Sequence, residues 1–246
     1  MMQGWVAIFK REIFSYFATP VALVFMVVFL VLSGAFTFYL GDFFIRDQAD
    51  LQSFFIYHPW LFLFLIPAVS MRLWAEERRS GTFELLLTLP VSTFAVVFGK
   101  FLAAWIFTGL ALAMTFPIWI TVNYLGAPDN GVILAGYFAS FLMAGSYLSI
   151  GAALSALTRN QIIAFVGTAA ICFLFMASGL PLVQNLFFGW APEALVSLVA
   201  SFSFLGHFNS ILKGVIEGRD LLFFISLIAF WLFVNCIFVD LKREAG

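Results

Sequence analysis

Charged side chains are scarce in this sequence of 246 residues. Asp, Glu, Lys and Arg make up only 10% of the chain, whereas 63% of it is hydrophobic. A soluble domain carries about a quarter charged residues, so this much apolar surface cannot all be buried in one soluble core. We therefore predict a membrane protein that exposes part of its surface to lipid. The net charge of -1 excludes the basic surface typical of a nucleic-acid-binding protein.

Cysteine and histidine are also rare, and their scarcity excludes several kinds of site. Cys172 and Cys236 both lie in apolar runs, so we interpret them as small apolar residues of membrane helices and predict no disulfide. His58 and His207 are far apart and lack a neighbouring cluster of Cys, Asp or Glu, so no metal site is predicted. No Ser/His/Asp pattern indicates a hydrolase, and the chain is predicted to be non-catalytic.

A phosphate-binding loop is absent as well. The sequence has one Gly-Lys pair, Gly99-Lys100, which lacks the earlier glycine of that motif and is followed by Phe101. We therefore expect no cofactor site in this chain. Charged side chains are also missing from the middle of the apolar runs. Because a charge at mid-bilayer costs about 2.5–3.5 kcal/mol on insertion scales, their absence disfavours a proton-coupled carrier or a voltage sensor.

Six apolar runs are long enough to cross a membrane, since about 20 apolar residues span the hydrocarbon core. Backbone amides in lipid must be paired within a helix or a closed barrel, and these runs do not alternate as barrel strands do. The sequence therefore predicts an all-α membrane protein with six transmembrane helices, at residues 20–40, 54–74, 101–125, 132–157, 162–183 and 221–239. The uncharged run 18–39 is too long for the apolar part of a cleavable signal peptide, so none is expected.

Residues 194–212 form an uncharged stretch that is long enough to be a seventh span. Its serines, His207 and Asn209 make transfer into lipid less favourable. We therefore predict one or two external re-entrant or interfacial helices before the last span, with a seventh span as the alternative.

The distribution of Lys and Arg predicts the orientation, because these residues are enriched in cytoplasmic loops. With six spans and both termini in the cytoplasm, the inside set is Lys10, Arg11, Arg72, Arg78, Arg79, Lys100, Arg159, Lys242 and Arg243, and the outside set is Arg46, Lys213 and Arg219. A seventh span leaves the same totals on the two sides. The basic pair directly after the last run favours six spans in the cytoplasmic (inner) membrane.

The first residues of the chain have the pattern of an amphipathic helix. Trp5, Phe9, Ile13 and Phe17 recur every four residues, which places them on one helix face. We predict an interfacial helix over residues 1–19 that lies in the headgroup layer. The alternative is a cytoplasmic extension of the first span, but Pro20 favours a new helix start at that position.

Residues 75–90, between the second and third predicted spans, are rich in charge. Gly81 is predicted to end the extension of the second span, and Thr82 to cap a new short helix that stops before Pro90. Phe83, Leu86 and Leu87 would share one side of that helix. Such a loop helix can pass motion from a soluble partner to the membrane, although a solvated boundary after a span has a similar composition.

The run Glu-Glu-Arg-Arg-Ser-Gly-Thr-Phe-Glu-Leu-Leu-Leu-Thr-Leu-Pro over residues 76–90 resembles the signature loop of type-2 ABC exporter permeases. The layout of the whole chain is similar to that family: an amphipathic first helix, six spans and an external helical segment before the last one. Residues 207–220 resemble the branch associated with gliding-motility transporters.

This resemblance implies a single permease domain over residues 1–246. Its parts would be an interfacial helix 1–19, five spans within 20–183 that include the coupling loop 75–90, an external helical segment 184–220, a sixth span 221–240 and a cytoplasmic tail 241–246. It also implies that 76–89 includes a coupling helix that docks on an ABC ATPase subunit. The implied coupling residues are Glu76, Glu77, Arg78, Arg79, Thr82, Phe83, Glu84, Leu86 and Leu87, and the implied external-helix residues are His207, Lys213 and Glu217.

The function implied by the resemblance is export of an amphiphilic or polymeric substrate, driven by ATP that is bound with Mg²⁺ in the partner subunit. The implied partners are the ATPase, a second permease copy in a homo- or heterodimer, an additional envelope or periplasmic-domain subunit, and the lipid bilayer. A membrane scaffold with a mechanical or gliding-associated role is the first alternative, and an ion-coupled carrier is the second.

Overall fold

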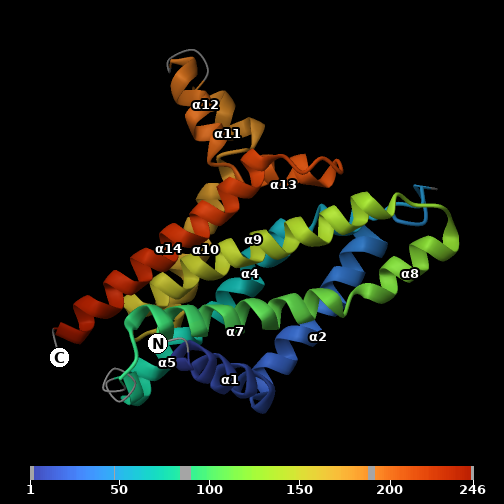
Figure 1. Ribbon diagram of the computed structural model, residues 1–246. Coiled ribbons are helices and arrows are strands. Elements are labelled where there is room, and N and C mark those ends of the chain that lie inside the picture. Colours follow the sequence, from blue (N-terminus) through green and yellow to red (C-terminus); the bar gives the residue numbers. More distant parts are fainter. Residues whose placement is uncertain (1–2, 47, 84–89, 188–191, 245–246) are drawn as a thin grey trace.

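The computed structural model describes residues 3–46, 48–83, 90–187 and 192–244, and these residues contain helices and no strand (Figure 1). Five helical segments are long and apolar enough to cross a membrane: Ala22–Leu40, Gln52–Ser80, Thr93–Leu125, Asn130–Leu157 and Gly218–Arg243. These five correspond to the first four and the last of the predicted spans. The all-helical membrane fold is therefore confirmed.

The fifth predicted span, 162–183, is shorter in the structure than expected. Helix α10 (Gln161–Ala177) has 17 residues, and α11 (Pro181–Phe187) follows after a short break. The break contains Gly179 and ends at Pro181, which has no backbone N–H for a continuing helix. At about 1.5 Å per residue, α10 is roughly 25 Å long, a few ångströms less than the hydrocarbon core.

Residues 194–212 form two short helices. Helix α12 (Glu193–Ser201) and helix α13 (Phe204–Leu212) have nine residues each, so neither is longer than about 14 Å. Ser203 separates them because its hydroxyl accepts a hydrogen bond from the Gly206 N–H at 3.0 Å and caps α13. The segment therefore does not form one continuous seventh helix. Figure 1 shows α11 and α12 standing out from the rest of the bundle.

The break predicted at Pro20 is present. Helix α1 (Gln3–Ala18) ends before Thr19, whose backbone is extended, and Pro20 begins helix α2 (Pro20–Ala35), which continues as the short π-helix η1 (Phe36–Leu40). Helix α1 is therefore not a straight extension of the first span. It packs along helix α7 (Thr93–Ala113), as Figure 1 shows.

The face of α1 that contacts α7 overlaps the predicted apolar face. Trp5 meets Phe98 edge-on, Tyr16 stacks on Phe107 and Ile8 is buried, whereas Phe17 meets Phe107 edge-on and is 46% exposed. The backbone oxygen of Trp5 comes so close to Gly99 that a Cβ there would lie only 2.9 Å away. Helix α1 is therefore fitted to the protein through one face, and part of the predicted face remains uncovered.

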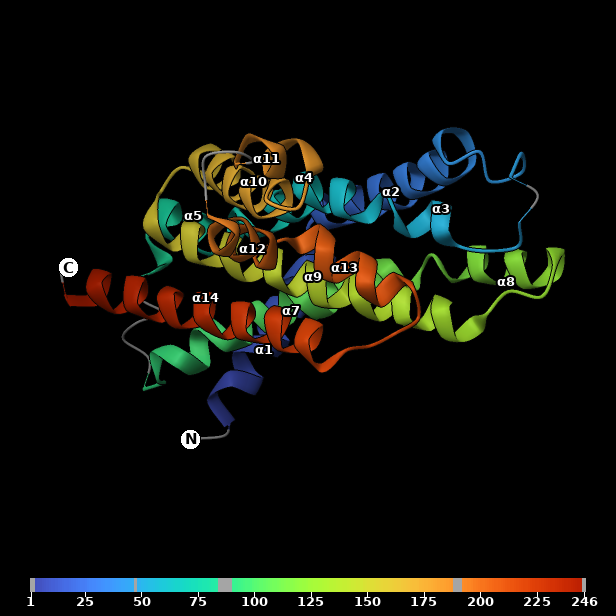
Figure 2. The same cartoon turned by 90° about the horizontal axis from the view of Figure 1, so that it is seen from above.

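Helix α9 (Asn130–Leu157) is the centre of the bundle. It packs against α7, α10, α13, helix α4 (His58–Ser70), helix α5 (Arg72–Ser80) and helix α14 (Gly218–Glu244), as Figure 2 shows from above. Small residues on α9 allow this close approach. A Cβ at Gly151 would lie 1.9 Å from the Ser70 hydroxyl, and one at Gly145 would lie 2.7 Å from the Trp105 ring.

Two further helices complete the end of the bundle opposite α5. Helix α3 (Gln52–Phe55) precedes α4, and helix α8 (Phe116–Leu125) continues α7 after Met114 and Thr115. Asp129 then caps α9 by accepting hydrogen bonds from the N–H groups of Gly131 and Val132. The side chains of Asp129 and Ser80 thus lie at opposite ends of the molecule, because the far end of α9 contacts α5 through Ala156 and Arg78.

Cysteine labelling tests this arrangement in a membrane. In a background in which Cys172 and Cys236 are replaced by Ala, a cysteine at Asp129, Glu193 or Glu217 should react with an impermeant maleimide added outside the cell. A cysteine at Ser80 should react only after permeabilisation. All four positions are exposed, so access depends on the side of the membrane. Labelling of Glu193 and Glu217 from opposite sides would contradict the six-span topology.

Candidate functional site

The charged loop after the second span begins as the sequence predicts. Helix α5 extends α4 beyond a break at Met71 and ends at Gly81, which has φ +75° in the left-handed region that glycine tolerates. Thr82 and Phe83 are helical again. Glu84, Leu86 and Leu87 lie outside the described residues, so the predicted short helix is seen only at its first two residues.

Helix α5 is fixed to α9 through its backbone. The Ser155 hydroxyl accepts hydrogen bonds from the N–H groups of Trp74 and Ala75 at 3.1 and 3.0 Å, and it donates to the Met71 carbonyl at 2.8 Å. The first N–H groups of a helix have no partner within the helix, and here a neighbouring helix supplies one. The Arg78 guanidinium also donates to the Ala156 carbonyl at 2.8 Å.

Phe83 is covered by another side chain of the same protein. Its side chain is 7% exposed, meets the Trp74 ring edge-on with centroids 5.9 Å apart, and lies 5.8 Å from the Arg78 guanidinium carbon. The ring is therefore packed against an apolar surface that Trp74 provides. Arg79 near the end of α5 and Thr82 just after Gly81 are both exposed.

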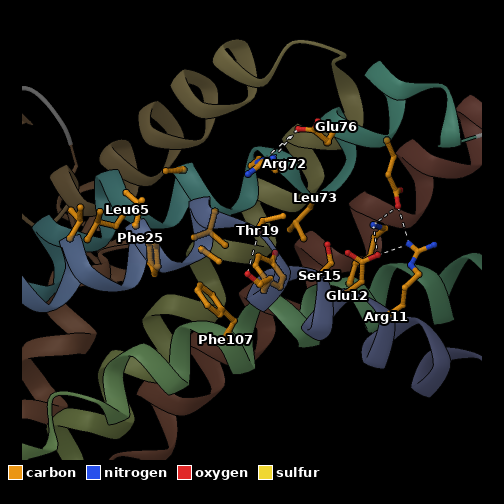
Figure 3. Close-up of a pocket in the computed structure, with 18 of the residues that line it drawn as sticks. Arg11, Glu12, Ser15, Thr19, Phe25, Leu65, Arg72, Leu73, Glu76 and Phe107 are labelled. Carbon is orange, nitrogen blue, oxygen red and sulfur yellow. Dashed lines mark hydrogen bonds and ion pairs between the residues drawn. The ribbon is translucent and has the colours of Figure 1, made fainter.

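Four charged residues from three helices meet beside α5. Lys100 of α7 is 2% exposed, and its ammonium lies 3.1 Å from the Glu12 carboxylate of α1 and 2.8 Å from the Glu77 carboxylate of α5. Arg11 reaches the same two carboxylates, at 2.5 Å from Glu12 and 3.0 Å from Glu77. The Lys100 ammonium also lies 5.2 Å from the Trp74 ring centroid. We call Arg11, Glu12, Glu77 and Lys100 the charge clamp; Figure 3 shows Arg11 and Glu12 turned toward each other.

The charge clamp is electrically balanced, with two cations and two carboxylates. Burial opposes ionisation of Glu12, but the charges of Lys100 and Arg11 outweigh it and hold the pKa of Glu12 below its ordinary value. Burial likewise lowers the pKa of Arg11, but its hydrogen bonds and charge interactions with Glu12 and Glu77 raise it above the ordinary value. Glu12 and Arg11 are therefore both stabilised in their charged forms.

Sequence reasoning missed this pairing. It assigned Lys100 only to the cytoplasmic set of cations and did not single out Glu12. A signal was present, because Lys100 is the one charged residue between Thr93 and Leu125. A lone cation in an apolar helix requires a partner, although the sequence does not say which carboxylate supplies it.

Glu76 forms a second, more exposed group beside the clamp. Its carboxylate lies 3.4 Å from Arg72 one turn earlier and also accepts a hydrogen bond from Gln161 at the start of α10. Of the predicted coupling residues, Glu76, Glu77 and Arg78 thus make contacts inside the chain that orient α5, and Arg79 and Thr82 face outward.

The three external-helix residues have different surroundings. His207 of α13 is buried, with its Nδ1 2.6 Å from the Asp220 carboxylate of α14 and its Nε2 3.0 Å from the Ser201 carbonyl. Lys213 ends α13, and Glu217 precedes α14; both are exposed. His207 therefore joins α13 to α14, a contact that spacing in the sequence did not reveal.

Comparison with known proteins places these features in a family. Residues 6–193 match the model of the ABC-2 family transporter protein. A stretch of 70 residues is 39% identical to heme exporter protein B of Rhodobacter capsulatus. This stretch makes up 28% of this chain and 32% of that protein. The chain thus spans about a third of the length of this relative.

Removal of the buried ammonium should destabilise the fold. Lys100→Met removes the buried cation that Glu12 and Glu77 share and leaves them only the half-exposed Arg11, so the free energy of unfolding should fall by about 3 kcal/mol, as for other broken buried pairs. Denaturant unfolding in detergent at neutral pH measures this. Lys213→Met, at an exposed lysine, is the control and should change little. Equal stability of the two variants would mean that the clamp does not support the fold.

The stability that Glu12 contributes should depend on pH. Since its pKa is lower in the folded chain than in the unfolded chain, the contribution is complete above the unfolded value near 4.5 and is lost as pH falls through the folded value. The difference in stability between the wild-type chain and Glu12→Gln should therefore be constant from pH 7 to about 5.5 and shrink below pH 4.5. A difference that grows on acidification would contradict this assignment.

Proposed function

The chain belongs to the ABC-2 transporter family, and we propose that it is the membrane subunit of an ATP-driven exporter whose ATP is bound and hydrolysed by a separate subunit. The observation that carries this proposal is the family match over residues 6–193, which includes the charged loop and the helices that hold it. The sequence supports a separate ATPase because it lacks a phosphate-binding loop.

We propose that the loop after α5 is the contact with the ATPase. Arg79 and Thr82 are exposed there, and Glu84, Leu86 and Leu87 follow in the sequence as further contact residues. Phe83 has a different role in this proposal: its buried ring ties the loop to Trp74. A movement of the loop caused by the ATPase would then displace α9 through the hydrogen bonds of Ser155. It would displace α1 and α7 through the ion pairs of Glu77.

We infer that the clamp end of the bundle faces the cytoplasm of an inner membrane. Arg11 and Lys100 contact Glu77 of α5 at this end, and Arg78 of α5 bonds to α9. Arg46 lies at the other end, where it bonds to Ser53. This separation fits the predicted orientation if α10 also crosses the membrane, as the fifth of six spans along the chain. Only 28% of the most apolar stretch of the first span, and the same share of the last, is buried within the protein. The remaining surface of these two helices is available to lipid or to a second permease copy.

We propose an amphiphilic or polymeric substrate. We do not propose haem, although the name of the similar protein contains it. His58 is fully buried with its Nδ1 2.8 Å from the Ser140 hydroxyl, and His207 is engaged by Asp220. Neither histidine is presented to a ligand. The resemblance to the gliding-associated branch rests on residues 207–220, beyond the matched range 6–193, so a scaffold role in that branch remains the second proposal.

Co-purification with a co-expressed ABC ATPase tests the loop. Leu87→Asp should abolish retention of the ATPase because it places a charge in an apolar contact, while the permease still folds. Arg79→Glu should weaken retention and change its salt dependence. Phe83→Asp should lower the melting temperature of the permease itself, since that ring is buried.

The matched control is Arg243→Glu, which reverses an exposed arginine at the end of α14 and should leave ATPase retention unchanged. Normal retention by Leu87→Asp and Arg79→Glu together would end the coupling-loop proposal. The purified chain alone should hydrolyse no ATP.

A further inference from the structure

A cavity of about 810 Å³ opens between α1, α2, α4, α5 and α7, next to the charge clamp. One end is apolar and is lined by Phe25, Val28 and Leu65 of α2 and α4. The other end is polar and is lined by side chains of the clamp and by Arg72 and Glu76. Figure 3 shows this division: Phe25, Leu65 and Phe107 lie together at one end, and Arg11 and Glu12 lie at the other.

The charges that line the cavity are balanced. Arg11, Lys100 and Arg72 are matched by Glu12, Glu77 and Glu76. The two ion groups are not equivalent, because Lys100 is 2% exposed and held by two carboxylates, whereas the Arg72 and Glu76 side chains are 32% and 46% exposed. Within the described part of the chain, Arg72 contacts only Glu76, at 3.4 and 3.5 Å.

Hydroxyl groups lie between the two ends. Ser15 of α1 and Thr19, which precedes α2, line the cavity, and Figure 3 shows both near Leu73. The cavity thus presents an apolar wall at one end, and hydroxyl, guanidinium and carboxylate groups toward the other. This combination matches the acyl chains and the polar headgroup of a phospholipid.

We propose that this cavity binds one phospholipid with a phosphate and a primary ammonium headgroup, of the phosphatidylethanolamine type. The phosphate would accept hydrogen bonds from Arg72 and a neighbouring hydroxyl, and the ammonium would donate to Glu76. Acyl chains gain little by leaving a bilayer for an apolar wall, because lipid tails are equally apolar, so the headgroup must provide the selectivity.

The balance of charge selects the zwitterionic headgroup. An anionic phospholipid would bring one negative charge that the lining does not compensate, since each of its cations already has a carboxylate. A choline headgroup carries no N–H to donate to Glu76. The lipid would bridge α1 to α5 and so support the clamp, independently of the exported substrate and of the ATPase.

Native mass spectrometry of the purified full chain tests this inference. The chain is released from detergent in the presence of equal amounts of phosphatidylethanolamine, phosphatidylcholine and phosphatidylglycerol with identical acyl chains. One phosphatidylethanolamine should remain bound, at about tenfold higher occupancy than either competitor, which is the effect expected of one charge-assisted hydrogen bond. Equal retention of the choline or the glycerol lipid would overturn the proposal.

Two pairs of variants locate the site. Arg72→Gln should reduce retention about tenfold by removing the phosphate donor, whereas Arg79→Gln, an exposed arginine of the same helix outside the cavity, should not. Val24→Trp should block the apolar end, whereas Val27→Trp should not: the two valines are 60% and 59% exposed on α2, and only Val24 lines the cavity.

These bulky substitutions are on an exposed helix face, so both tryptophan variants should elute and melt as the wild-type chain does. Unchanged retention in Arg72→Gln and in Val24→Trp would show that the lipid binds elsewhere. The measurement needs no ATPase, so its failure would leave the proposed exporter role untouched.

Discussion

A single buried ammonium determines how the charged end of this protein is built. Lys100 lies in the third membrane segment, yet its two carboxylate partners come from the helix before the first segment and from the extension of the second. Membrane helices are not pressed together by the hydrophobic effect, because lipid is as apolar as their side chains. Polar contacts and close packing must set their positions. Lys100 supplies such a contact at the point where α1, α5 and α7 meet, and it would be costly to bury without both partners.

The loop that follows α5 takes its position from this contact and from α9. Ser155 replaces the missing helical partners of two N–H groups in α5, and Gly151 lets α9 come close enough to do so. Phe83 packs edge-on against the Trp74 ring, and the Lys100 ammonium also lies near that ring. The loop is therefore held at its start by hydrogen bonds, by charge and by aromatic packing, and a force applied to it would be passed on to three helices.

Local chemistry made several features of the fold predictable. Pro20 and Gly81 set helix boundaries through their own backbone preferences, and the polar residues of 194–212 indicated that it is not one continuous span. The pairing of Lys100 with Glu12 and Glu77 depends on three segments that are far apart in sequence, and no local pattern contains it. Phe83 fits an exposed apolar face by its spacing, and only the nearby Trp74 ring decides that it is covered. The break after Ala177 could have been read from Gly179 and Pro181, but hydropathy outweighed them in the prediction.

Helix α14 connects the clamp end to the opposite end. Near its last residues Asp240 accepts a hydrogen bond from Thr93 at the start of α7, which follows the charged loop, and near its first residues Asp220 contacts His207 of α13. Between these two contacts α14 is apolar and runs along α9 for about 30 Å, at 1.5 Å per residue. Helix α14 therefore links the start of α7 to α13 through one side-chain contact near each of its ends. The polar contacts of α14 thus lie near its two ends, and the apolar stretch between them packs on α9.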